Sequence, residues 1–307
     1  MNSITLHTCA KVNLCLRVLS RRPDGFHNLE SVVHAVGLWD RVDLTDLGPG
    51  EGISIAVEGE EAPTDETNLC WKAAQALAER SRTSRGVAIS LHKGIPAGTG
   101  LAGGSSDAAA TLVGLAKLWG LTIPREEMLS LAAQVGSDVP FFLLGGCCLA
   151  LGRGEKLEPL PSVPLPLVVV VPERRVPTAK AYAALRRGAS LGRRKTLTGA
   201  TRRAIEAVKS GDPTAVAAAL HNDFEAVEML AVTEALEAKT ALLEAGCLGA
   251  LLSGSGSAAF GIAPEQAAAG SIAARLRERW GWVSLAPTVA VEECMMVSHE
   301  AVEAQEP

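Results

Sequence analysis

The segment at 93–107, Lys-Gly-Ile-Pro-Ala-Gly-Thr-Gly-Leu-Ala-Gly-Gly-Ser-Ser-Asp, combines five glycines with two serines and an acid. Glycines leave backbone N–H groups sterically open. The serines at 105 and 106 begin a helical pattern, and the amides and dipole of a helix N-terminus attract phosphate. The segment therefore indicates an anion site. The simpler alternative is a tight strand-to-helix turn with Ser105 as the helix cap.

The same segment contains G-x-G-x-x-G at 98–103, which several nucleotide-binding folds share. A dinucleotide fold needs a second hydrophobic strand after the helix, whereas the short, proline-broken stretch 120–124 follows here. A Walker loop needs a lysine before the serine, and a glycine stands there. The V-A-I-K, H-R-D and D-F-G motifs of protein kinases are absent from the sequence. The motif alone leaves phosphate binding open.

Composition excludes several classes of protein. The chain has 307 residues, of which 48% are hydrophobic and 21% charged, and a net charge of -5. These values are typical of a globular protein of two domains and give no basis for a nucleic-acid partner. The apolar run at 165–171 is too short to span a membrane, and polar residues interrupt the N-terminal stretch. Seven cysteines without C-x-x-C indicate reduced thiols, so we expect a cytoplasmic protein.

Hydrophobic periodicity and turn residues predict alternating strands and helices. Strands are expected at 4–9, 12–19, 29–38, 53–57, 87–92, 147–151, 167–171, 248–252, 258–262 and 282–286, and helices at 68–80, 105–118, 125–135, 179–186, 201–209, 213–220, 234–245 and 264–279. Helix 105–118 is apolar on almost every side, which predicts that it is buried. The Pro- and charge-rich stretch 153–164 suggests a domain boundary. We expect domains at 1–155 and 156–290 and a partly disordered tail at 291–307.

Five regions together resemble the galactokinase–homoserine kinase–mevalonate kinase–phosphomevalonate kinase superfamily. They are the glycine-rich segment, Ala-Lys-Val-Asn-Leu at 10–14 with Asp-Gly-Phe-His at 24–27, Gly-Ser-Asp-Val-Pro-Phe at 136–141, Pro-Thr-Ala-Lys-Ala-Tyr at 177–182, and Asn-Asp-Phe-Glu at 222–225 with Ser-Gly-Ser-Gly at 253–256. The resemblance covers about residues 4–290. It implies an α+β fold, a two-domain α/β sandwich. The N-terminal domain would be like ribosomal protein S5 domain 2 and the C-terminal domain ferredoxin-like, with the active site in the cleft between them.

Within the superfamily, the chain resembles the kinases that use ATP to phosphorylate the 2-hydroxyl of 4-diphosphocytidyl-2-C-methyl-D-erythritol, a step of the non-mevalonate route to isoprenoid precursors. Mg²⁺ is expected to compensate the charge of the ATP phosphates. The sequence offers no acidic pair for the metal, although Ser106 is conceivable. The residues that the resemblance assigns to ATP are Pro96, Ala97, Gly98, Thr99, Gly100, Leu101, Ala102, Gly103, Gly104, Ser105 and Ser106, with Asn68 and Asp107 near the base and ribose.

Asp138 and Lys11 are the candidate catalytic residues. Transfer of a phosphoryl group to an alcohol needs a group that orients the hydroxyl and accepts its proton. Asp138, expected at a loop-to-strand junction, could do this, although an aspartate there could equally cap a helix. Lys11 lies in a hydrophobic strand, so its cation should face a cleft and a carboxylate. Its simpler interpretation is an edge-strand lysine that guards against aggregation.

The resemblance also assigns residues to the acceptor substrate. Asn13 and His27 are expected to contact the cytidyl group, and Phe26 and Tyr182 to stack on either side of the cytosine. Relatives often have tyrosine at the position of Phe26, and stacking survives that change. The remaining assigned residues are Thr178, near the methylerythritol end, and Ser253 with Gly254, in a loop that could close on the phosphates. Each aromatic residue could instead belong to the core, and the loop could be a plain hairpin turn.

Two other functions fit parts of this pattern. One is another kinase of the superfamily, such as a homoserine or mevalonate kinase, but the turn at 24–27 is by resemblance part of a cytosine pocket. The other is an inactive nucleotide-binding regulator, which would need neither Lys11 nor Asp138. The basic stretch 186–203 is expected to be a solvated loop rather than a ligand site.

Overall fold

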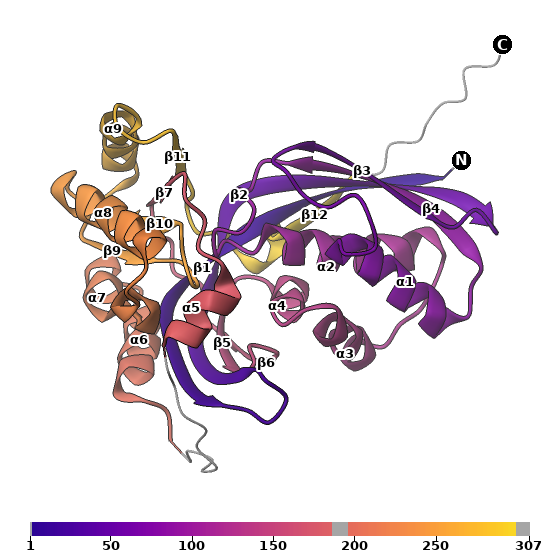
Figure 1. Ribbon diagram of the computed structural model, residues 1–307, viewed down its shortest axis with the longest axis horizontal. Coiled ribbons are helices and arrows are strands. Elements are labelled where there is room, and N and C mark those ends of the chain that lie inside the picture. Colours follow the sequence, from indigo (N-terminus) through magenta and orange to yellow (C-terminus); the bar gives the residue numbers. More distant parts are fainter. Residues whose placement is uncertain (1, 186–195, 299–307) are drawn as a thin grey trace.

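Residues 2–185 and 196–298 are described by the computed structural model, and they form two β-sheets flanked by helices (Figure 1). The larger sheet has the main strand order β12-β1-β2-β4-β3; β5 and β6 extend it beside β2, and β8 lies beside β1. Its strands are β1 (Ser3–Arg21), β2 (His27–Pro49), β3 (Ile53–Gly59), β4 (Arg85–Lys93), β5 (Cys147–Gly152), β6 (Lys156–Leu160), β8 (His221–Asn222) and β12 (Met295–Ser298).

Four helices cover one face of the larger sheet: α1 (Leu69–Ser81), α2 (Gly103–Leu118), α3 (Arg125–Val135) and α4 (Val139–Leu144) (Figure 1). Helix α2 lies closest to the strands. A Cβ on Gly114 would stand 2.5 Å from Leu44 Cδ1 and 2.7 Å from Leu6 Cδ1. The outer side of α2 packs against α1 and α4. This double contact explains why α2 is apolar on almost every side, as the sequence predicts.

The smaller sheet is antiparallel, with the order β11-β7-β10-β9. Its strands are β7 (Leu167–Val171), β9 (Gly249–Leu252), β10 (Ala259–Ile262) and β11 (Trp282–Leu285), and the helices around it are α5 (Thr178–Ala184), α6 (Gly199–Ser210), α7 (Pro213–Ala219), α8 (Leu230–Glu244) and α9 (Gln266–Arg277). Counting its strands along the chain, the order is fourth, first, third, second. This arrangement is the ferredoxin-like one, so the predicted fold class is confirmed.

The two sheets share a hydrophobic core. On β7, Val168 and Val170 pack with α8 and α9, whereas Val169 faces the opposite side. There it joins Val12 and Leu14 of β1 in a single cluster that also includes side chains of α6 and β10. Alternate residues of a strand face opposite sides of its sheet, which is why the wholly apolar strand β7 can serve two interfaces.

Several predicted boundaries differ from the structure. The strands expected at 4–9 and 12–19 are one strand, β1, whose pairing with β2 shifts register between Cys9 and Ala10. The boundary expected after residue 155 falls within the β5–β6 hairpin, because β6 pairs with β5 in the larger sheet. The expected tail begins instead with a short 3-10 helix, Val291–Glu293, followed by β12, which pairs with β1. Residues 299–307 of that tail, and 186–195 of the basic stretch, lie outside the described residues.

Helix α3 and strand β7 match their predicted ranges residue for residue. Helix α4, by contrast, was not expected, because six residues are too few to show a helical period. Within the described residues, no helix has both the length and the apolar character that crossing a membrane requires.

Candidate active site

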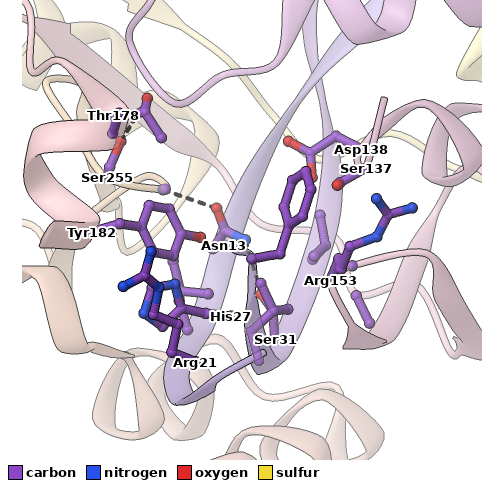
Figure 2. A pocket seen from close by; sticks show the side chains of 18 of the residues that line it. Asn13, Arg21, His27, Ser31, Ser137, Asp138, Arg153, Thr178, Tyr182 and Ser255 are labelled. Carbon is purple, nitrogen blue, oxygen red and sulfur yellow. Dashed lines mark hydrogen bonds between the residues drawn. The ribbon is translucent and has the colours of Figure 1, made fainter. Parts of the chain in front are cut away.

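A cavity of about 830 Å³ opens between β1, β2, the turn that joins them, α5 and the 253–256 hairpin (Figure 2). Cavities of this size commonly hold small molecules in proteins. Eight of the residues predicted from the sequence line it together: Lys11, Asn13, Phe26, His27, Asp138, Thr178, Tyr182 and Gly254. They come from both halves of the chain, so the fold assembles the predicted acceptor site and both candidate catalytic residues in one place.

Lys11 lies on β1 with only 4% of its surface exposed. Its Nζ donates to Asn13 Oδ1 and to the carbonyl oxygen of Gly100, both at 2.7 Å. An ammonium group has three N–H donors, so within the described residues one remains for the cavity. Burial lowers the pKa of Lys11, and the charge of Asp138 partly opposes that shift. The cation and the carboxylate are therefore close enough to interact.

Asp138 precedes the short helix α4, so the expected loop-to-strand junction is wrong: this is a loop-to-helix junction. The chain turns directly into a helix there because Val139, Phe141 and Phe142 must all reach the core beneath the larger sheet. Asp138 occupies the cap position, but its side chain makes no capping hydrogen bond to α4. The carboxylate lines the cavity instead. The cap interpretation thus does not account for this side chain.

The 253–256 hairpin ties the smaller-sheet half to the glycine-rich loop. Ser253 Oγ donates to the carbonyl oxygen of Gly100 at 2.9 Å, and the Gly254 N–H donates to Asn13 Oδ1 at 2.9 Å. Asn222 holds the hairpin from below, since its Nδ2 donates to the carbonyl oxygens of Leu252 and Gly254, each at 2.8 Å. The hairpin is therefore fastened over the residues that surround Lys11.

The glycine-rich loop ends in an N-terminus of α2 that no side chain caps. The cap residue is Ala102, with φ +62°, and the helix begins at Gly103, two residues earlier than expected. Ser105 is therefore inside the helix and is not its cap. Gly104 lies in the first turn and is exposed, and a Cβ there would meet no atom within 4 Å. Neither backbone conformation nor packing requires glycine at 104, so the open space beside it is free for a ligand.

Other members of the loop face inward and support its shape. Thr99 Oγ1 donates to the carbonyl oxygen of Pro96 at 2.7 Å, and Leu101 and Gly103 are buried. Ser106 is fully buried, where its Oγ donates to the carbonyl oxygen of Cys9 at 2.6 Å and contacts Thr8 Oγ1. Since this hydroxyl is turned into the protein, it does not offer the metal ligand that seemed conceivable from the sequence. Between residues 96 and 106, the accessible part of the loop is formed by Ala97, Gly98, Gly100, Ala102, Gly104 and Ser105.

Asn68 and Asp107 have structural partners in place of an open site. The Asn68 side chain caps α1 by accepting from the Cys70 N–H at 2.8 Å, and its Nδ2 donates to the carbonyl oxygen of Pro63. Asp107 is 1% exposed and forms an ion pair with Lys93. Neither lines the cavity, and the buried carboxylate of Asp107 cannot reach a ribose without rearrangement.

The rings of His27 and Tyr182 lie beside each other in the cavity (Figure 2). The rings of Tyr182 and His27 lie 5.2 Å apart at 31°, and Phe224 meets the Tyr182 ring edge-on at 4.8 Å. Burial lowers the pKa of His27, and Arg21 lowers it further, so both effects favour the neutral ring. Phe26 is exposed at the rim, and the Cζ atom of Arg153 lies over it, 4.8 Å from the centre of the Phe26 ring. The cytosine sandwich between Phe26 and Tyr182 stays a prediction.

Sequence reasoning missed further residues that line the cavity, among them Arg21, Ser31, Ser137, Arg153 and Ser255. The pairing of β1 with β2 could have placed Ser31, since it lies opposite Leu16, and Asn13 Nδ2 donates to its Oγ at 2.8 Å. Ser255 Oγ donates to Thr178 Oγ1 at 3.2 Å, which joins the hairpin to α5. Arg153 follows β5 and carries no local signal. Among residues 2–185 and 196–298, no group of His, Cys, Asp or Glu is arranged to hold a metal ion.

Comparisons with known proteins agree with this geometry. Residues 68–146 match the family described as GHMP kinases N terminal domain, and residues 204–281 match GHMP kinases C terminal. The 4-diphosphocytidyl-2-C-methyl-D-erythritol kinase of Pelotomaculum thermopropionicum is 44% identical over 89% of this chain and 94% of its own length. The kinase of the same description from Synechococcus sp. (strain JA-2-3B'a(2-13)) is 41% identical over 94% of this chain and 96% of its own.

Solved structures show the same relationship. A crystal structure of a 4-(cytidine 5'-diphospho)-2C-methyl-D-erythritol kinase superposes with a TM-score of 0.75 at 35% identity, covering 92% of this chain and 98% of the other. A homoserine kinase from Cytophaga hutchinsonii has a TM-score of 0.73 at 21% identity over 97% of this chain and 98% of its own, which shows the shared fold alone. The chain therefore belongs to the GHMP kinases, and within them to the family of 4-diphosphocytidyl-2-C-methyl-D-erythritol kinases.

Proposed function

We propose that this chain transfers the γ-phosphoryl group of ATP to the 2-hydroxyl of 4-diphosphocytidyl-2-C-methyl-D-erythritol. The observation that carries the proposal is that Asp138, Lys11, His27 and Tyr182 all line the same cavity. A carboxylate and a cation provide for phosphoryl transfer, and a neutral histidine with an aromatic face suits a nucleobase. Family membership favours this acceptor over homoserine or mevalonate. The carboxylate of Asp138 does not cap α4 and is free to act in the cavity, which argues against an inactive regulator.

The triphosphate would bind along the accessible side of the loop, at Gly98, Gly100, Gly104 and Ser105, where the N-terminus of α2 presents N–H groups and a favourable dipole. The missing side chain at Gly104 leaves room for a phosphate. Lys11 lies on the cavity side of Gly100, so its cation would stabilise charge on the transferring group. The hairpin at Ser253 keeps this lysine and the loop in fixed relation.

Asp138 would orient the acceptor hydroxyl and take its proton late in the transfer. We infer that Mg²⁺ accompanies ATP and compensates the charge of its phosphates. Because the described residues offer no acidic cluster and Ser106 is turned inward, the phosphates themselves would provide its main ligands. We further infer that the chain works in the cytoplasm on this small substrate, without a nucleic-acid or membrane partner, as the net charge of -5 suggests.

The test offers the purified chain Mg-ATP with the cytidyl substrate, homoserine or mevalonate and follows ADP release. We expect release with the cytidyl substrate alone, and two-dimensional NMR of the product should place the new phosphate on the 2-oxygen. Asp138→Asn should lower kcat by about 10²- to 10⁴-fold, the usual range for a lost general base. The matched control is Asp212→Asn, which changes an aspartate that caps α7, remote from the cavity. Equal losses in both variants, or turnover of homoserine or mevalonate, would refute the proposal.

A further inference from the structure

Beneath the glycine-rich loop lies a charged cluster that the proposed reaction does not use. It consists of Lys93, the last residue of β4, Asp40 on β2 and Asp107 on α2. The ammonium of Lys93 donates to the carboxylate of Asp40 and to Asp107 Oδ2, the latter at 2.5 Å. The three side chains are 2%, 0% and 1% exposed. Charged groups are rarely this deeply buried, so the cluster needs a physical explanation.

The cluster grips both ends of the loop. At the entry, Asp40 Oδ1 accepts from the N–H groups of Gly94 and Ile95, at 2.7 and 2.9 Å. At the exit, Asp107 belongs to the beginning of α2, and a Cβ on Gly103 would stand 3.0 Å from Asp40 Oδ2. Asp40 therefore contacts the loop at its entry and lies against its exit, where Asp107 follows in the helix. A change in the charge of the cluster therefore acts close to both ends of the loop.

The cluster contains two acids and one cation, and the two acids have unequal partners. Asp40 accepts from Lys93 and from two backbone N–H groups, whereas Asp107 Oδ1 is buried without a hydrogen-bond partner among the described residues. An unpartnered carboxylate oxygen in the interior favours the protonated acid. Burial raises the pKa of Asp107 to about 8; Asp40 adds to the rise and Lys93 opposes it. The other titratable group that faces it is the Cys70 thiol of α1, whose own pKa burial raises.

We propose that Lys93, Asp40 and Asp107 are positioning residues for the phosphate loop, and that the form which binds the triphosphate carries a proton on Asp107. The inference rests on the proposed function of the loop. When Asp107 is neutral, the cluster has no net charge and the N-terminus of α2 attracts anions. When Asp107 loses its proton, a negative charge stands in the interior at the same end of that helix, where it opposes the phosphates. Triphosphate binding and protonation of Asp107 are thus coupled.

Calorimetry of a non-hydrolysable ATP analogue, the β,γ-imido triphosphate with Mg²⁺, tests this coupling without turnover. With the unmodified chain we expect Kd to rise about fivefold between pH 7 and pH 9. Titrations at pH 8.5 in two buffers of different ionisation enthalpy should show uptake of a fraction of a proton per bound analogue. In Asp107→Asn the amide cannot titrate, so the Kd ratio between the two pH values should fall toward one. Lys11 and the analogue titrate alike in both proteins, so the difference between them isolates residue 107.

Asp46→Asn is the matched control. This residue also lies on β2, but it pairs with Arg85 away from the loop, so the variant should keep the pH dependence of the unmodified chain. If Asp107→Asn does not fold, Asp107→Ser offers the same comparison, because its hydroxyl does not titrate in this pH range either. Analogue binding with the same pH dependence and the same proton uptake in Asp107→Asn as in the unmodified chain would overturn this inference alone. If the analogue does not bind at any pH, the proposed function itself fails.

Discussion

Gly100 lies against the 253–256 hairpin, and its replacement by alanine has a predictable cost. Its φ is +86°, and a Cβ there would stand 2.0 Å from the carbonyl oxygen of Ser253. No alanine side chain can occupy that space, so the 253–256 hairpin must move by about 1 Å or more to restore an ordinary contact. The movement pulls on the hydrogen bond from Ser253 Oγ and on the one from Ala258 N to Thr99 O.

The magnitude follows from these contacts. A non-glycine residue in the left-handed region costs about 1 kcal/mol. The two hydrogen bonds together contribute about 2 kcal/mol. Gly100→Ala should therefore reduce the free energy of unfolding by about 3 kcal/mol. It should also lower kcat, because Lys11 Nζ donates to the displaced carbonyl of Gly100. Gly98→Ala is the control: its φ is +68°, but its Cβ would meet no atom within 4 Å, so it should cost only about 1 kcal/mol.

Urea unfolding of the full chain and both variants measures the difference in free energy of unfolding. The dependence of that free energy on urea concentration should be the same in all three proteins, so that only the midpoints differ. We expect a gap of about 2 kcal/mol between Gly98→Ala and Gly100→Ala. Equal free energies of unfolding for the two variants would refute the reasoning, since they would show that the hairpin does not rest on the loop.

Two further predictions concern His34 and Tyr182. Burial lowers the pKa of His34 to about 4 against an ordinary 6.5, while its hydrogen bond to the Ala35 carbonyl opposes the shift. The unfolded chain therefore binds the extra proton first, and the free energy of unfolding should fall by about 3 kcal/mol as the pH drops from 6.5 to 4. Urea unfolding between pH 6.5 and 4 should show a smaller fall of the free energy of unfolding in His34→Gln than in the unmodified chain. The same fall in both proteins would contradict the assignment. Tyr182→Leu should raise KM for the cytidyl substrate about tenfold, while Tyr182→Phe should leave it nearly unchanged, as stacking requires. Equal KM values for Tyr182→Leu and the unmodified chain in steady-state assays would exclude stacking.

Much of the secondary structure could be predicted from local sequence patterns. Helix α3 shows a full helical period and β7 is a run of valines with turn residues on both sides, so both were predicted to the residue. The register of β1 against β2 then brings Lys11 and Asn13 to the cavity, an arrangement that alternation along one strand already suggests. Where a residue's neighbours in sequence decide its structure, the sequence alone was sufficient.

Sequence reasoning was weakest for residues whose partners are distant along the chain. Asp107 is a polar residue in an apolar helix, and only the adjacency of β2, β4 and α2 reveals that Lys93 and Asp40 surround it. Arg153 reaches Phe26 only because β5 pairs with β2. Such contacts depend on which strands pair, and no periodicity or spacing encodes that. The role of Asp138 depended on motif resemblance for the same reason.

The first sheet is completed by the last described strand. Residues 5–8 of β1 pair with Met295–Ser298 of β12. The whole smaller-sheet half therefore lies in the sequence between two strands that are neighbours in the larger sheet. During synthesis the ribosome releases β1 long before its partner exists. Until then the outer edge of β1 presents unsatisfied N–H and C=O groups, a template on which another nascent strand can add. This edge of β1 is therefore covered only after the whole smaller-sheet half has been synthesised.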